Sequence, residues 1–266
     1  MQGFANSQNL HDTQNPPIDG RNTEMVYYAH QTPLLGSPNG RGASPSGLAL
    51  AFSKDRMNTL RTIVYVDGFN LYHGALRHTP YKWLNVHALA KLLIGDNKNI
   101  VKIKYFTARV SPRANDPEQP FRQHLYLRAL ATLNAQVVYG RYLSHVVRMY
   151  KAHQVRGEDP FVEVVKTEEK GTDVNIASHM IVDAADDLLD CAILISGDSD
   201  LTTPVKLCIG KYGKIVGVLN PQKQKCMTLE KEATFYKHIR ESALASSQFE
   251  AVLTDAQGSF HKPAKW

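Results

Sequence analysis

The sequence AILISGDSD, at residues 192–200, decides the fold that we expect for this chain. Four apolar residues run directly into a Ser-Gly turn, and two aspartates one residue apart follow it. A short apolar run bounded by a turn signal is typical of a strand buried on both faces, as in a parallel sheet. We therefore expect Asp198 and Asp200 at the carboxyl end of a strand, where open α/β sheets carry their sites. The alternative is that one of them only caps a helix beginning near Leu201.

A second stretch of the same design lies upstream. The apolar run TIVYV, at residues 62–66, leads into Asp67-Gly68-Phe69-Asn70. Aspartate is a poor strand residue, and two strands that both end in carboxylates are harder to explain as unrelated turns. The pair of strand ends therefore favours a functional cluster over two separate helix caps.

Strand and helix patterns alternate over about 190 residues, which is the order of a doubly wound sheet. Helices follow these strands, including one at 121–133 and a last one at 229–239. The expected strands cover residues 62–66, 100–110, 136–142, 191–195 and 214–219. The sequence thus predicts an α/β fold with a central, mostly parallel sheet.

The clearest helical pattern begins after Lys170-Gly171-Thr172-Asp173. Its apolar residues recur at spacings of three and four, which predicts one buried face: Val174, Ala177, Met180, Ile181, Ala184 and Leu188. Thr172 is a candidate N-cap, and Asp173 in the first turn suits the positive end of the helix dipole. Asp173 also falls at the same edge of the sheet as the other carboxylates, so both roles stay open.

The chain divides into three parts by composition. Residues 1–56 are rich in Asn, Gln, Ser, Pro and Gly without a helical or strand period, which predicts a disordered leader outside the functional unit. Residues 57–250 carry the α/β pattern, with a basic β-hairpin or arm at about 144–170. Residues 251–266 have no clear pattern, and we expect a flexible tail.

Composition excludes some classes of protein. No apolar run approaches the ~18 residues of a membrane span, and the first residues lack the pattern of a signal peptide. Three cysteines without metal-ligand spacing favour reduced thiols in a cytoplasmic protein. Neither a P-loop nor a glycine-rich dinucleotide-binding loop is present.

The net charge of +6 is unevenly distributed. Residues 98–170 contain 13 Lys and Arg against 7 Asp and Glu, and so account for the surplus. Such a segment is compatible with a polyanion such as RNA, because phosphate neutralisation dominates nucleic-acid affinity. A solvated basic surface explains the charge equally well.

Asp67, Asp173, Asp198 and Asp200 would all meet at one edge of the predicted sheet. Four adjacent carboxylates repel each other, and a divalent cation removes that repulsion. Mg²⁺ and Mn²⁺ prefer oxygen ligands and serve phosphodiester hydrolysis, whereas no Cys or His spacing favours zinc.

Three further residues are candidates for substrate binding: Asn70, Lys170 and Ser196. Lys170 could contact a phosphate, and Asn70 or Ser196 could hold a water or a backbone oxygen. Each also has a simpler interpretation, as a helix cap for Asn70, a surface charge for Lys170 and a turn residue for Ser196.

Three sequence blocks, at residues 66–71, 170–174 and 196–200, resemble the signature blocks of the NYN domains, which are PIN-like proteins of a group that includes the LabA relatives. The blocks are VDGFNL, KGTDV and SGDSD, and the likeness covers about 62–250. The resemblance implies a three-layer α/β/α PIN-like fold and a ribonuclease site that depends on Mg²⁺ or Mn²⁺. It assigns the acidic positions to Asp67, Asp173, Asp198 and Asp200, with Asn70 from the first block. PIN-like domains often pair, so a homodimer is also implied, although no heptad or apolar stripe demonstrates one.

Two other functions stay open. The chain could be a non-catalytic regulator that keeps the fold to bind RNA or a partner. It is also similar to NYN-type proteins described as NADH-dependent 6-hydroxy-3-succinoylpyridine hydroxylases, monooxygenases of nicotine breakdown in soil pseudomonads. Such chemistry usually requires a cofactor, and the residues contain no flavin or dinucleotide fingerprint. A divalent-metal-dependent ribonuclease is therefore the primary expectation.

Overall fold

Six parallel strands form the centre of the structure, a computed structural model that describes residues 59–266. Their order across the sheet is β3-β2-β1-β6-β7-β8, and each neighbouring pair runs parallel. The strands are β1 (Leu60–Asp67), β2 (Lys98–Thr107), β3 (Gln136–Tyr139), β6 (Cys191–Ile195), β7 (Ile215–Asn220) and β8 (Phe235–His238). The predicted α/β fold with a parallel central sheet is confirmed. The predicted disordered leader, residues 1–56, lies outside the described residues.

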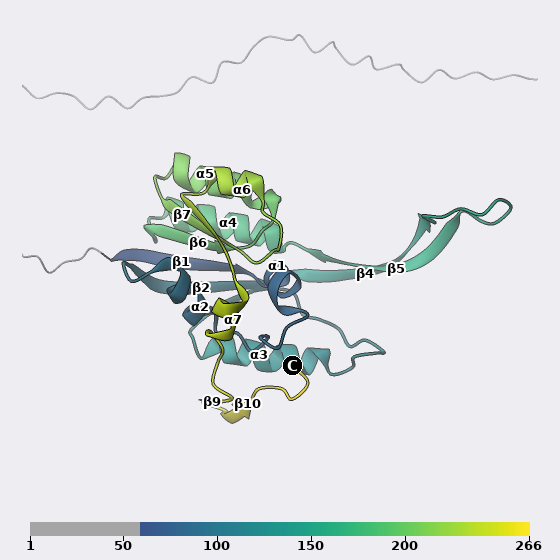
Figure 1. Cartoon of the computed structure of the whole chain (residues 1–266), viewed down its shortest axis with the longest axis horizontal. Coiled ribbons are helices and arrows are strands. Elements are labelled where there is room, and N and C mark those ends of the chain that lie inside the picture. The colour runs from purple at the N-terminus through teal and green to yellow at the C-terminus, as the bar shows by residue number, and fades with distance from the viewer. Residues whose placement is uncertain (1–58) are drawn as a thin grey trace, which may run out of the picture. The chain divides into compact units, whose positions relative to one another are not determined.

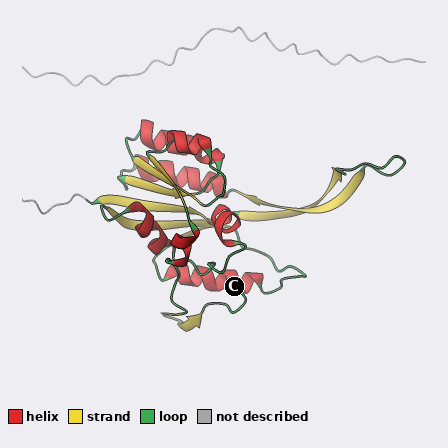
Figure 2. Ribbon diagram, viewed as in Figure 1, coloured by secondary structure: helices red, strands yellow, loops and turns green. Residues whose placement is uncertain are grey.

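Helices cover both faces of the sheet and complete a three-layer α/β/α sandwich (Figures 1 and 2). On one face lie α2 (Val86–Ile94), α3 (Gln119–Ala131) and α7 (Glu241–Ala245), together with the short α1 (Gly68–Leu71) and η1 (Tyr72–Leu76). On the other lie α4 (Thr172–Ala185), α5 (Thr202–Gly210) and α6 (Met227–Glu232), with the single turn η2 (Ser199–Leu201) leading into α5. Within residues 59–266, no helix has the length and apolarity needed to cross a membrane.

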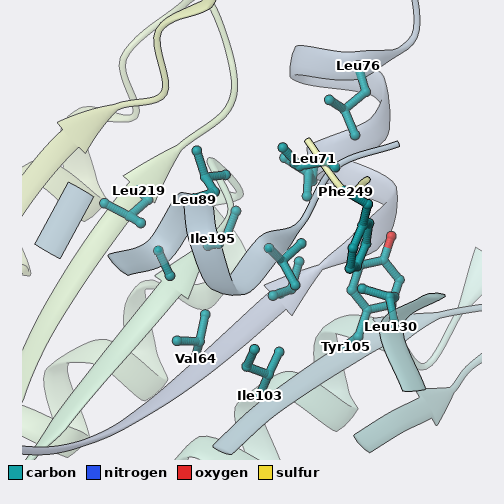
Figure 3. Packing of buried hydrophobic residues seen from close by; sticks show 14 of the residues in the cluster. Val64, Leu71, Leu76, Leu89, Ile103, Tyr105, Leu130, Ile195, Leu219 and Phe249 are labelled. Carbon is teal, nitrogen blue, oxygen red and sulfur yellow. The ribbon is translucent and has the colours of Figure 1, made fainter. Parts of the chain in front are cut away.

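Strand β1 explains why the sheet requires continuous apolar runs. Successive side chains of a strand point to opposite faces. Ile63 and Tyr65 pack with the α4 and α5 layer, whereas Val64 and Val66 pack with the α2 and α3 layer. All four are 2% exposed or less. Figure 3 shows Val64 among the side chains of the core on the α2 and α3 face, which also includes residues from α2 and β6. Both faces of β1 are covered, and its acidic residue, Asp67, falls where the strand ends.

A long two-stranded arm extends from the sandwich between β3 and α4 (Figure 1). It consists of β4 (Arg141–Tyr150) and β5 (Phe161–Lys170), which pair antiparallel along their whole length. The hairpin spans the segment for which the sequence predicts a basic arm. The base of the arm is held by the Gly140 N–H, which donates to the Thr107 carbonyl of β2 at 2.8 Å. The arm therefore begins and ends at the carboxyl edge of the sheet.

The helix expected at residues 229–239 is wrong in its second half. The segment divides into α6 and the edge strand β8, and α6 ends where the backbone of Ala233 becomes extended. The ring of Phe235 lies over Gly217 of β7, where an added Cβ would come within 2.1 Å of it. A short apolar run does not distinguish a strand from a helix by its period, and here pairing with β7 decides for the strand.

The face of α4 also differs from the prediction. Ile176 and Met180 are fully buried and Asp183 is 4% exposed, whereas Val174 is 68% exposed and Leu188 is 51% exposed. The buried face is rotated because it includes a charged residue. Apolar periodicity cannot identify a face that buries an aspartate, since the partner of that aspartate comes from another strand.

Residues 251–266 differ from the flexible tail that we expected. They form a hairpin of β9 (Val252–Asp255) and β10 (Gly258–His261). Phe260 is 4% exposed, and the rings of Phe260 and Trp266 lie 6.4 Å and 6.1 Å from the ring of Trp83. Arg128 of α3 also forms an ion pair with Asp255 at 2.6 Å. Aromatic packing and this ion pair give the segment a defined place.

Candidate active site

The neighbouring strands β1 and β6 bring two of the predicted site residues together. Val66 pairs with Ile195, so the next residues, Asp67 and Ser196, lie side by side at the carboxyl edge. The Ser196 hydroxyl donates to Asp67 Oδ2 at 2.9 Å, and the Asn70 N–H donates to Asp67 Oδ1 at 2.9 Å. Asp67 is 3% exposed. Among residues 59–266, no Lys, Arg or His forms an ion pair with it, so both of its partners are neutral.

The loop after β6 is fixed by hydrogen bonds that its own sequence provides. The Ser196 hydroxyl accepts from the Asp198 N–H at 3.1 Å, and Asp198 Oδ1 accepts from the Asp200 N–H at 3.0 Å. Asp198 is therefore the N-cap of η2, as the alternative interpretation of the sequence expects. Capping occupies one of its carboxylate oxygens. The helix cap and a role in the site are thus compatible at the same residue.

Asn70 connects this loop to the helix that follows β1. Its Oδ1 accepts from the Gly197 N–H at 3.0 Å and from the Gln222 side chain at 3.0 Å. Gly197 has no room for a side chain, since a Cβ would lie 2.3 Å from the Asn220 side-chain oxygen. Asn70 and Ser196 thus have partners inside the protein, and their predicted role in substrate binding stays a prediction.

Asp173 joins the cluster from α4. Gly171, with φ of 89°, precedes the helix, and Thr172 is its first residue rather than a side-chain N-cap, which corrects the predicted cap. Partial burial raises the pKa of Asp173, and the charges of Asp198 and Asp200 raise it further. Asp173 and Asp200 are exposed, whereas Asp67 is buried. The charges of the four predicted aspartates therefore act on one another, and the residues range from the core, at Asp67, to the surface, at Asp173 and Asp200.

The pKa of Asp67 also responds to the charges of the neighbouring aspartates. Burial raises it to about 6, against the lowering effect of the hydrogen bonds from Asn70 and Ser196, and the charges of Asp173 and Asp198 raise it further. A buried carboxylate with other carboxylates as its charged neighbours is costly to ionise. The cluster is therefore short of positive charge at neutral pH.

Glu169 is a fifth acidic residue that the sequence interpretation missed. Partial burial raises its pKa to about 7, and the charges of Asp67 and Asp173 add to the increase. Its Oε1 is buried without a hydrogen-bond partner in the described part of the chain, as is the hydroxyl of Thr172. An added Cβ at Gly140 would lie 2.6 Å from that hydroxyl and 3.3 Å from Glu169 Oε1. In the sequence, Glu169 could have been noticed because it directly precedes the KGTDV block. The sequence does not distinguish it from its neighbour Glu168, which is also a glutamate.

Lys170 lies apart from these contacts. Its ammonium pairs with Glu168 at 3.2 Å, and its side chain is 50% exposed. The surface-charge interpretation of Lys170 agrees with this placement, and a contact with phosphate stays a prediction.

The donors at this edge suit a hard divalent cation in their chemistry. They are carboxylate and hydroxyl oxygens, which Mg²⁺ and Mn²⁺ prefer. In residues 59–266 no three His, Cys, Asp or Glu side chains are grouped closely enough to hold a metal ion as they stand. Ion binding would therefore have to draw the exposed aspartates toward Asp67. The orphaned oxygens of Glu169 and Thr172 are further polar groups that lack a partner here.

A curated protein and a solved structure are among the known proteins to which this chain is similar. The relative is the 6-hydroxy-3-succinoylpyridine 3-monooxygenase HspA of Pseudomonas putida (strain DSM 28022 / S16), which is 28% identical over 239 residues, or 78% of this chain and 75% of the relative. A crystal structure of a protein of unknown function from Vibrio parahaemolyticus RIMD 2210633 is similar, with a TM-score of 0.46 and 21% identity over 72% of this chain and 98% of that chain.

The family model of the NYN domain matches residues 61–239, which include the two central strands, the arm and all four aspartates. NYN domains are a family of PIN-like nuclease domains, and membership supports a nuclease-type function. On this match, the chain belongs to the NYN domain family.

Proposed function

We propose that the protein is a ribonuclease that depends on a divalent cation and hydrolyses RNA phosphodiester bonds at the aspartate cluster. The observation that carries the proposal is the setting of Asp67. It is buried, its hydrogen-bond donors are neutral, and the charged groups that shift its pKa are Asp173 and Asp198. An arrangement of this kind is favourable only when a cation or a proton neutralises it.

Each aspartate has a distinct part in this proposal. Asp67 would hold the ion from inside, kept in one orientation by Ser196 and Asn70. Asp173, Asp198 and Asp200 would complete the ligand set from the surface. A bound Mg²⁺ or Mn²⁺ supplies charge stabilisation at the scissile phosphate and a more acidic water.

The protein's own residues would position the reaction around that group. In hydrolysis a water oxygen attacks phosphorus, the bond to the leaving oxygen breaks, and the proton released by the water must be accepted. The proton can pass to bulk solvent, because the site is open to solvent where Asp173 and Asp200 lie. The hydrogen-bonded loop at 196–198 fixes the backbone of Asp198 relative to Asp67, which is a positioning role.

RNA as the substrate rests on the family and on charge. The segment 98–170 carries 13 bases against 7 acids. Several of these bases are already neutralised inside the protein, such as Lys104 by Asp183 and Arg128 by Asp255. The remaining surface charge supports a polyanionic partner.

The test is cleavage of labelled RNA by the full chain with Mg²⁺ or Mn²⁺ and with a chelator. We expect cleavage that requires the ion and that falls by about a thousandfold or more in Asp67→Asn, because several kcal/mol of charge stabilisation is lost. Asp96→Asn is the matched control, since Asp96 is an exposed aspartate in the turn before β2. Ion binding without cleavage would favour a regulator that only binds RNA.

A second candidate function is the chemistry of the curated relative, a monooxygenase by its name. The observation that favours it is a cavity of about 1080 Å³ beside Asp198, which is large enough for a small aromatic acid. Consumption of NADH on addition of 6-hydroxy-3-succinoylpyridine, unaffected by Asp67→Asn, would support it against the nuclease.

A further inference from the structure

The arm formed by β4 and β5 is a part of the molecule that the nuclease proposal does not use. Figure 1 shows it extending beyond the sandwich as a ribbon of two strands. Within residues 59–266, the side-chain hydrogen bonds and ion pairs of residues 142–168 all join residues of the arm itself. A two-stranded hairpin is only marginally stable in water unless a further surface packs against it. The arm is therefore a candidate interaction surface.

Large apolar side chains are exposed on the outer part of the arm. Val146 of β4 is 64% exposed, and Val165, which pairs with it across the arm, is 72% exposed. Tyr150 near the tip is 67% exposed, and its ring lies 4.2 Å from the ring of Phe161. Adjoining apolar residues that remain exposed mark sites of interaction with other molecules.

The charges of the arm are largely balanced within it. Residues 141–170 contain 6 Lys and Arg against 5 Asp and Glu. Four ion pairs of 3.2 Å or less form between them: Arg148–Asp159, Lys151–Glu158, Lys166–Glu168 and Lys170–Glu168. A polyanion would find few unpaired cations on this ribbon, so a protein surface suits the arm better.

One face of the arm has a pattern that complements its own reversal. Successive side chains alternate between the two faces, and residues that pair across the ladder share a face. We call the face that carries Val146 the Val146 face. Its pairs, from base to tip, are Tyr142/Glu169, Ser144/Thr167, Val146/Val165, Arg148/Glu163 and Tyr150/Phe161. The valine pair is the middle one, so a two-fold axis across the strands at this pair would place each valine on its own copy.

The two ends of the Val146 face also complement each other in charge. In the reversed arrangement Phe161 of one copy lies opposite Glu169 of the other, because both are four residues from Val165 in β5. The Arg148 guanidinium lies over the ring of Phe161, 4.5 Å from its centroid. Glu169 is half-buried, and the charges that raise its pKa are those of Asp67 and Asp173. The second copy would thus bring a cation to an acid whose charged neighbours are acids.

The opposite face of the arm does not have this symmetry. Its pairs, from base to tip, are Arg141/Lys170, Leu143/Glu168, His145/Lys166, Val147/Val164 and Met149/Val162. An axis at the middle pair would place Lys166 on Lys166 and apolar residues over cations. Like charges that meet in this way disfavour association. Self-association is therefore expected through the Val146 face.

We propose that the Val146 face of the arm binds the same face of a second copy of this chain, base against tip, across a two-fold axis at Val146 and Val165. An interface of this kind uses one surface twice and closes as a dimer. Each copy then places the outer end of its arm, with Tyr150, Phe161 and Arg148, beside the aspartate cluster of the other copy. Both chains would therefore border each aspartate site.

The test is the mass of the full chain in solution, measured by sedimentation equilibrium over a range of concentrations. We expect a dimer for the wild type. Val165→Lys and Val165→Asp should each weaken it by roughly tenfold or more, because like charges meet at the axis. An equal mixture of the two variants should recover the dimer, because the charges that meet are then opposite. The matched controls are Val252→Lys and Val252→Asp, at a valine of β9 that is 47% exposed.

Each outcome supports or overturns the arm interface, whether or not the protein cleaves RNA. Loss of the dimer in both Val165 variants with recovery in the mixture supports it, since only a residue that meets its own copy gives this result. Thermal unfolding of each variant shows that the chain is still folded. A monomeric wild type, a dimer that withstands both Val165 variants, or a mixture that stays monomeric overturns it. A monomeric wild type whose RNA affinity falls in Val165→Asp would assign the arm to RNA instead.

Discussion

Two aspartates of this domain are buried to the same degree, but the charges around their carboxylates are opposite in sign. Asp67, at the end of β1, is 3% exposed, and Asp183, on α4, is 4% exposed. Asp183 Oδ2 accepts from the Lys104 ammonium at 2.6 Å and from the Tyr65 hydroxyl at 2.7 Å. Asp67 accepts only from a backbone N–H and the Ser196 hydroxyl, and its charged neighbours are acids.

The two settings distinguish a buried charge that stabilises the fold from a buried charge that lacks a counter-ion within the described residues. Removing an ion from water costs several kcal/mol, and a well-placed opposite charge offsets that cost. At Asp183 the chain itself provides the opposite charge, so the pair is complete when the protein is folded. At Asp67 the chain adds further carboxylates, and the opposite charge has to come from outside. The contrast separates a core ion pair from a site that is complete only with a cation.

The largest effect on stability is expected at the completed pair. Asp183→Asn leaves the Lys104 ammonium buried without a counter-charge, and we expect the free energy of unfolding to fall by about 3–5 kcal/mol. Urea unfolding of the full chain measures it. The double variant Asp183→Leu with Lys104→Met should recover most of the loss, since no charge is then left unpaired. A loss of less than about 1 kcal/mol in Asp183→Asn would show that the pair is not what holds α4 to β2.

Replacing Asp67 is expected to raise the free energy of unfolding when metal is removed, whereas replacing Asp183 lowers it. Because the pKa of Asp67 is raised to about 6 in the folded protein, its contribution to stability is fully present below about pH 4 and is lost as the pH rises through 6. In a chelator at pH 8, Asp67→Asn should therefore be more stable than the wild type by up to about 3 kcal/mol. Unfolding curves of both proteins at pH 4 and pH 8 test the sign. A wild-type protein that gains stability relative to the variant on going to pH 8 would contradict it.

The smallest expected effect is a change in Mn²⁺ affinity that differs between two adjacent glutamates. The charges of Asp67 and Asp173 raise the pKa of Glu169, whereas Glu168 forms ion pairs with Lys166 and Lys170. Glu169→Gln removes a charge near the cluster and should weaken Mn²⁺ binding by about tenfold, on the scale of charges a few ångström apart. Glu168→Gln is the matched control and should leave the affinity unchanged. Equal effects of both substitutions would mean that Glu169 acts only through net charge.

The sequence predicted the architecture and the place of the candidate site, because both depend on local patterns. An apolar run followed by Asp marks the end of a buried strand, and parallel strands end at one edge. The structure brings Asp67 and Asp198 together for this reason. What each carboxylate does there is a separate matter, and the metal, the RNA and the catalytic roles stay proposals.

The remaining features depend on contacts between distant parts of the chain. Nothing in the pattern around Asp183 indicates that Lys104, 79 residues away, is its partner. The predicted face of α4 is therefore wrong at Val174 and Leu188, whereas Met180 and Ala184 are buried as expected. The pairing of the arm decides that Glu169, rather than Glu168, turns toward the aspartates. The segment of β8 was mistaken for helix because its identity comes from pairing with β7. These are tertiary effects that residue type and spacing do not contain.

The most direct test of the central claim is calorimetric titration of Mn²⁺ into the full chain, with Asp67→Asn and Asp96→Asn measured beside it. We expect the wild type and Asp96→Asn to bind the ion and to gain stability by mass action, about 2.7 kcal/mol at a concentration of 100 Kd. Asp67→Asn should lose both the heat and the gain while it remains folded. An absence of binding in the wild type, or equal binding in Asp67→Asn, would mean that these carboxylates are caps and turns and not a metal site.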